Sequence, residues 1–102
     1  MEQPKFILTE EVIQHLTSKN KSNLTFDITL SGGGCCGFFE LEDISLEKPK
    51  NLEHYYHENI SEIDVYVTKR ARFVGSAVQF NLLKGFLNKS ITVSGVKLIN
   101  KA

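Results

Sequence analysis

The sequence predicts a mostly β domain of the α+β class, with mixed or antiparallel sheets and one N-terminal helix. Apolar and polar residues alternate over 24–30 and again over 63–68, which is the period of half-buried strands. A helical repeat of apolar residues is clearest in one short stretch, 9–18, near the N-terminus. At 102 residues the chain has the length of one domain, and we expect a single domain over 1–102.

The predicted helix begins after Thr9, a residue type that caps helix N-termini well. Glu10 and Glu11 follow, where the helix dipole favours negative charge. The apolar residues that then recur at helical spacing, up to about Ser18, are Val12, Ile13 and Leu16. The short apolar run before it, 5–8, is either a strand or a segment that packs the N-terminus down.

Two predicted strands flank a glycine-rich stretch. The first, 24–30, runs directly into it, and a second leaves it with Phe39 and Leu41 alternating with acidic residues. Further strands are expected at 63–68 and 91–93, with Gly95 as a bend or bulge. We expect 47–51 to be a surface connection and 52–59 to be irregular.

The stretch 73–87 fits two interpretations. Phe73, Ala77, Phe80 and Leu83 share a helical face, whereas 78–82 alternates like a strand. Because Gly75 and Gly85 bracket the alternating part as turn residues, a strand is favoured. The preceding basic cluster is interpreted as a solvated turn rather than a partner-docking patch, and it consists of Lys69, Arg70 and Arg72.

Charge and hydropathy exclude some classes of partner. Twelve basic and twelve acidic residues cancel, so we expect neither nucleic-acid nor membrane binding. The longest apolar runs are far shorter than the ~20 residues of a transmembrane helix. No basic segment followed by an apolar one stands at the N-terminus, and the expected location is therefore the cytoplasm.

The chemistry is expected at Cys35 and Cys36, which are adjacent and lie in the segment Ser-Gly-Gly-Gly-Cys-Cys-Gly-Phe of residues 31–38. A cysteine pair in a reducing compartment is more often metal-binding or redox-active than structural. Adjacent cysteines also make a poor disulfide staple, because the bridge closes a tiny ring. The simpler alternative is two small buried thiols in a tight turn.

The segment Gly33-Gly34-Cys35-Cys36-Gly37-Phe38 resembles the Gly-Gly-Cys-Ser-Gly-Phe loop of the HesB-like family, the A-type iron–sulfur carriers. It is most similar to their CC/Se-motif (seleno)protein offshoot. The order of predicted elements agrees over most of the chain. The resemblance implies a HesB-like fold and a cofactor-binding loop of Gly33, Gly34, Cys35, Cys36 and Gly37. Cys35 falls on the cysteine with which the carriers hold iron or a cluster, and Cys36 falls on their serine.

This chain departs from the carriers at its C-terminus. The carriers end in a Cys-x-Cys-Gly segment that supplies two more thiolates, and residues 94–102 contain no cysteine. Iron–sulfur clusters and zinc usually take four ligands, so two chains related by a two-fold axis, each giving Cys35 and Cys36, would complete a site. His15, His54 and His57 are not spaced as zinc ligands with the cysteines and are interpreted as surface or packing residues.

Two functions remain open from the sequence. The first is binding of iron or an iron–sulfur cluster through Cys35 and Cys36 for assembly or delivery, with a homodimer and iron–sulfur assembly proteins as partners. The second is a thiol-redox protein whose cysteine pair cycles between dithiol and disulfide or sulfenic states. An inert interaction domain is the third alternative, and the sequence leaves open whether the chain is an enzyme.

Overall fold

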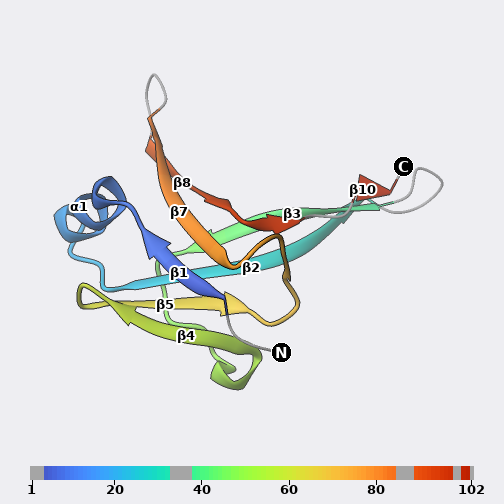
Figure 1. Cartoon of the computed structure of the whole chain (residues 1–102), viewed down its shortest axis with the longest axis horizontal. Helices are drawn as coiled ribbons and strands as arrows, with labels where there is room; N and C mark the ends of the chain where they lie inside the picture. Colours follow the sequence, from blue (N-terminus) through green and yellow to red (C-terminus); the bar gives the residue numbers. More distant parts are fainter. Residues whose placement is uncertain (1–3, 33–37, 85–88, 98–99, 102) are drawn as a thin grey trace.

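The computed structural model describes residues 4–32, 38–84, 89–97 and 100–101 and has one α-helix and three sheets (Figure 1). The five predicted site residues, 33–37, lie outside the described residues. In chain order the elements are β1 (Lys5–Leu8), α1 (Glu10–Ser18), β2 (Asn23–Gly32), β3 (Phe38–Ser45), the short 3-10 helix η2 (Leu52–His54), β4 (Tyr55–Ile60), β5 (Ile63–Thr68), β6 (Arg72–Phe73), β7 (Ala77–Lys84), β8 (Lys89–Ser94), β9 (Val96–Lys97) and β10 (Asn100–Lys101).

The sheets combine parallel and antiparallel pairs. The largest has the strand order β10-β3-β2-β5-β4, the second is β1-β7-β8, and β6 pairs with β9. Two pairs are parallel, β1 with β7 and β2 with β5, and the others are antiparallel. The predicted fold class, mostly β with one helix and mixed sheets, is confirmed.

The helix begins and ends where the sequence predicts. The backbone N–H of Val12 donates to Oγ1 of Thr9 at 3.4 Å, so Thr9 caps the first turn. Val12 and Leu16 are fully buried, as their spacing requires for a helix that packs by one face. Residues 5–8 form β1, the first of the two alternatives for that run. No helix among the described residues is long and apolar enough to cross a membrane.

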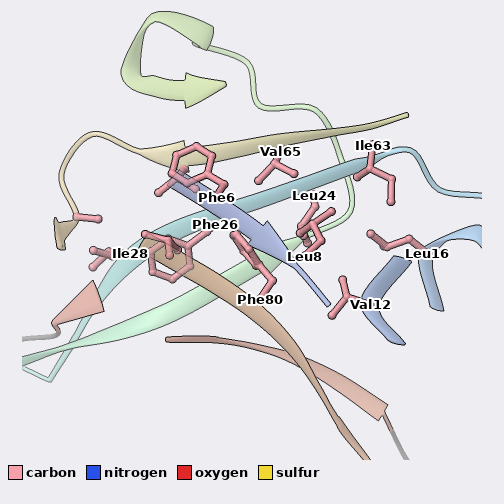
Figure 2. Close-up of a cluster of buried hydrophobic side chains, with 13 residues drawn as sticks. Phe6, Leu8, Val12, Leu16, Leu24, Phe26, Ile28, Ile63, Val65 and Phe80 are labelled. Carbon is pink, nitrogen blue, oxygen red and sulfur yellow. The ribbon is translucent and has the colours of Figure 1, made fainter. Parts of the chain in front are cut away.

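The hydrophobic core lies between the two larger sheets and is closed at one end by α1 (Figure 2). From the five-stranded sheet, Leu24, Phe26 and Val65 point inward and are fully buried. From the second sheet, Phe6 and Phe80 meet them, with exposures of 3% and 0%. Burying large apolar side chains from both sheets is what stabilises this arrangement, at about 1.5–3 kcal/mol for each.

The region 73–87 contains a strand, as favoured from the sequence. β7 alternates a fully buried Val78 and Phe80 with half-buried neighbours, and it pairs with both β1 and β8. Gly95 has φ +94°, between β8 and β9, so the bend predicted there is confirmed. Gly85, the second predicted bracket, lies outside the described residues.

The expectation of irregular structure over 52–59 is wrong. After η2 the chain forms β4, which pairs antiparallel with β5 through Ile60↔Ile63. Ser61 and Glu62 connect the two strands, and both have positive φ, as in a type I′ hairpin turn. The turn lacks the Asn-Gly or Asp-Gly signature that would have marked the hairpin, and a glutamate at 58 interrupts the apolar alternation of β4.

Candidate functional site

The two strands that flank the cysteines form one antiparallel hairpin. β2 and β3 are paired from Thr25↔Ser45 to Gly32↔Phe38. The chain from Gly33 to Gly37 therefore connects two strand ends that are held next to each other, as predicted from the alternation on both sides. Cys35 and Cys36 are among these connecting residues and are not described, so their exposure stays a prediction.

The cysteine end of this hairpin extends beyond the core. Along β2, Phe26 and Ile28 are 0% and 3% exposed, but the next inward position, Leu30, is 64% exposed. The described pairing of β2 with β5 ends at Phe26↔Val67, so from Asp27 onward β3 is the strand that continues beside it. The hairpin of β2 and β3 thus extends past the end of β5, and β10 joins it only at its far end, beside Phe38 and Phe39 (Figure 1). We call residues 29–32 and 38–41, beyond the buried Ile28, the hairpin arm.

The C-terminal strand lies at the same end of the sheet as the cysteine segment. β10 pairs with β3 through Asn100↔Phe39 and Lys101↔Phe38, directly at the exit of that segment. In this chain the two strand residues there are an asparagine and a lysine.

Two arginines of the predicted basic turn hold the hairpin. At the base of the arm, the Arg70 guanidinium donates to Oδ1 of Asp27 at 2.8 Å and to the backbone oxygen of Ile28 at 2.6 Å. Nearer the tip, Arg72 forms an ion pair with Glu40, whose side chain is only 13% exposed. Lys69 and Arg70 form an exposed turn, as predicted. Arg70 and Arg72 also contact residues 43 and 32 positions away along the chain, which periodicity does not reveal.

Asp27 is the centre of a polar network on the outer face of the sheet. Besides Arg70, it accepts hydrogen bonds from the Tyr55 hydroxyl at 2.6 Å and from the backbone N–H of Ile28 at 2.7 Å. Burial alone raises the pKa of the Asp27 carboxyl, but the hydrogen bonds from Tyr55 and Arg70 outweigh it and lower the pKa below its ordinary value. The same hydrogen bond raises the pKa of Tyr55 to about 12, with burial as the second cause.

The carboxylates of Glu40, Glu42 and Asp43 in β3 do not converge on one place. Because side chains alternate along a strand, Glu40 and Glu42 of β3 lie on one face and Asp43 on the other. Partial burial raises the pKa of Glu42, although the backbone N–H of Val93 donates to it and opposes the rise.

His57 packs against an aromatic ring, His54 is exposed and His15 is half-buried. The His57 ring stacks on Tyr66 with centroids 4.7 Å apart, and its Nε2 lies 2.8 Å from Oδ1 of Asp64. His15 is half-buried rather than exposed, and burial followed by the charge of Lys19 lowers its pKa. Among the described residues, no group of three or more histidine, cysteine, aspartate or glutamate side chains is placed to hold a metal ion.

Comparison with known proteins gives a fold neighbour and a family. The crystal structure of SufA from Escherichia coli, a protein involved in the biosynthesis of iron–sulfur clusters, is similar over 89% of this chain and 80% of that one, with a TM-score of 0.54 and 18% identity. At that identity the likeness concerns the fold. No curated protein matches the sequence. The model of the CC/Se motif containing family matches residues 4–96, and this chain therefore belongs to that family.

Proposed function

We propose that this protein is a HesB-like carrier that binds iron or an iron–sulfur cluster through Cys35 and Cys36, in cluster assembly or delivery. The observation that carries the proposal is the paired hairpin arm, whose described strands extend beyond the core and end at Gly32↔Phe38, on either side of the cysteine segment. The fold shared with SufA, a protein involved in iron–sulfur cluster biosynthesis, supports it. So does membership of a family named for its cysteine motif.

Ligand number leads us to propose a homodimer. Cys35 and Cys36 are the only cysteines of the chain, while an iron–sulfur cluster is usually held by four cysteine thiolates in total. Two copies joined by a two-fold axis would supply four thiolates. Gly33, Gly34 and Gly37 would let the backbone approach the bound metal closely, since they have no side chains. Iron–sulfur assembly proteins would then load or unload the dimer in a reducing cytoplasm, where the thiols stay unpaired.

The experiment that tests this proposal is anaerobic reconstitution with iron and sulfide, followed by visible absorption and by determination of iron, sulfide and mass in solution. Charge-transfer bands with one cluster per dimer are expected for the native sequence. Both Cys35→Ser and Cys36→Ser should lose them, whereas Ser94→Ala, which changes a hydroxyl outside the cysteine segment, should keep them. Absence of bound iron and sulfide from the native protein would contradict the proposal.

A thiol-redox function is the second candidate, and a specific feature of the fold favours it. The strand that adjoins the exit of the cysteine segment, β10, pairs Asn100 and Lys101 with Phe39 and Phe38, and residues 94–102 contain no cysteine. Two adjacent thiols without further ligands suit two-electron oxidation to a disulfide, with an external disulfide or peroxide as oxidant. Alkylation rates measured against pH distinguish the two: a thiol with a pKa well below ~8.5, in a protein that takes up no iron, supports the redox function.

A further inference from the structure

The connection between β3 and β4 crosses the outer face of the five-stranded sheet. In that sheet β2 and β5 separate the two strands, and residues 46–54, the crossing segment, pass over both (Figure 1). Thr25, on the outer face of β2, donates from its hydroxyl to the backbone oxygen of Glu47 at 2.7 Å. Thr25 and its register neighbour Tyr66 are only 5% and 4% exposed. The crossing segment therefore packs onto the sheet rather than extending into solvent.

A hollow of about 320 Å³ remains between the crossing segment and the sheet. Asp27 and Asp43, which are directly opposite in the β2–β3 register, lie on its sheet side. Lys48 and Lys50 of the crossing segment and Tyr55 at the start of β4 line the other side. The volume is at the lower end of the ~300–1,000 Å³ typical of small-molecule sites.

Some polar groups of this hollow already form hydrogen bonds or ion pairs within the protein, and others do not. Asp27 is held by Arg70 and Tyr55, and the Tyr55 hydroxyl uses its proton on Asp27, which leaves its oxygen able to accept. In the described part of the chain, the side chains of Asp43, Lys48 and Lys50 form no hydrogen bond or ion pair. The carboxylate of Asp43 and the ammonium groups of Lys48 and Lys50 are thus available to a ligand, whereas Glu47, which also lines the hollow, lies 3.9 Å from Nζ of Lys21.

Charge decides which class of ligand fits. A simple cation entering the hollow would meet the repulsion of Lys48 and Lys50, and a simple anion would meet that of Glu47 and Asp43 and would leave Asp43 unpaired. An apolar molecule would remove these charges from water without pairing them, at a high cost in free energy. A molecule with a cationic and an anionic end pairs with both sides.

We propose that this hollow binds a small zwitterion of the free amino acid class. The ligand's ammonium group donates to the Asp43 carboxylate and to the Tyr55 oxygen, and its carboxylate accepts from Lys48 and Lys50. The site is separate from the cysteine segment: Asp27 and Gly32 are five strand residues apart, or about 17 Å at ~3.3 Å per residue. The inference therefore stands whether or not the cysteines bind a cluster.

The test is a ¹H–¹⁵N NMR titration of the full-length protein with each common amino acid, followed by the amide and the N-acetyl derivative of the tightest one. We expect saturable shifts at the backbone amides of Asp43, Lys48 and Tyr55 for the amino acid. The amide lacks the anionic end and the N-acetyl form lacks the cationic end, so each should bind at least ten-fold more weakly. No saturable shift with any amino acid, or equal binding of a derivative, would overturn the proposal.

Variants complete the test. Asp43→Asn and the double variant Lys48→Gln/Lys50→Gln should each weaken binding at least ten-fold. Glu62→Gln and Lys19→Gln remove the same charges from exposed turn positions away from the hollow, and they should bind as the native protein does. If the lysines instead close onto Asp43 in solution, Asp43→Asn will destabilise the fold and no amino acid will bind, which also overturns the inference.

Discussion

Arg70, two residues after the end of β5, forms an ion pair with Asp27 of β2. Asp27 is the first residue of β2 beyond the described pairing of β2 with β5. The register of β2 with β5 ends at Phe26↔Val67, and the Arg70 guanidinium then reaches Oδ1 of Asp27 at 2.8 Å. The same nitrogen lies 2.6 Å from the backbone oxygen of Ile28, so it takes the role that a backbone N–H of a longer β5 would have. The hairpin arm is thus tied to the body of the protein at its base.

The acid stability of the fold should depend on Asp27. Its pKa is below the ordinary 3.8 in the folded protein, so the unfolded chain binds the extra proton as the pH falls. The stabilisation is complete above the unfolded pKa and is lost as the pH falls through the folded one. Asp27→Asn should lower the free energy of unfolding by about 1–3 kcal/mol at neutral pH, and stability should then fall less steeply as the pH decreases. Urea unfolding between pH 2 and 7 measures both the loss of ~1–3 kcal/mol at neutral pH and the fall of stability towards acid pH. An unchanged fall of stability in the variant would contradict the assignment.

The stability of the fold at alkaline pH should depend on Tyr55. Its pKa is raised to about 12 by the hydrogen bond to Asp27, followed by burial. A raised folded pKa stabilises the protein below the unfolded value of 10.0 and loses that contribution as the pH rises through about 12. Burial also raises the pKa of Tyr66, but ultraviolet titration of tyrosine should show the Tyr55 phenol as the last to ionise. Asp27→Asn should bring it close to the ordinary value, and Tyr55→Phe should remove it.

Arg72 and Glu40, which form an ion pair, should contribute to stability in an energetically coupled way. The Glu40 carboxylate is largely buried, so the pair is less screened than one on an open surface. We expect a double-mutant cycle of Arg72→Gln and Glu40→Gln to give a coupling energy of about 1 kcal/mol. The exposed pair of Lys84 and Glu11 is the control, and its cycle should give no more than a few tenths. Equal couplings in the two cycles would contradict the expectation.

The exposure of the hairpin arm predicts unequal costs for two neighbouring truncations. Ile28 and Leu30 occupy successive inward positions of β2, at 3% and 64% exposure. Ile28→Ala should destabilise by about 2–5 kcal/mol, because it leaves a cavity in the core. Leu30→Ala should stay within about 0.5 kcal/mol. Equal losses in chemical denaturation would show that the arm packs against the core in solution.

Two glycines with similar backbone angles provide a matched pair. A Cβ added at Gly95, with φ +94°, would lie 2.2 Å from the backbone oxygen of Ala77, whereas at Gly75, with φ +85°, nothing lies within 4 Å. Gly75→Ala should cost only the left-handed strain, about 1–2 kcal/mol. Gly95→Ala adds a backbone clash and should cost about 2 kcal/mol more, or prevent folding. Thermal unfolding compares them, and equal melting temperatures would contradict the clash.

The local periodicity of apolar residues was sufficient to predict most of the individual helices and strands. Thr9 with the apolar spacing after it defined α1, and the alternation around Phe26, Val65 and Phe80 defined three strands, because burial of one face imposes a residue pattern that one strand shows by itself. β4 was missed, since its hairpin turn through Ser61 and Glu62 uses residue types that do not normally signal positive φ.

For the candidate site, the sequence by itself determined the adjacent cysteines, the glycines around them and the two alternating strands on either side. The tertiary structure decided what surrounds that segment: the arm beyond the core, β10 at its exit, and the two arginines that hold it. It also decided that residues 46–54 cross the sheet and leave a hollow beneath them. These contacts join residues far apart along the chain, and their free energy comes from pairing across space, which leaves no period in the sequence.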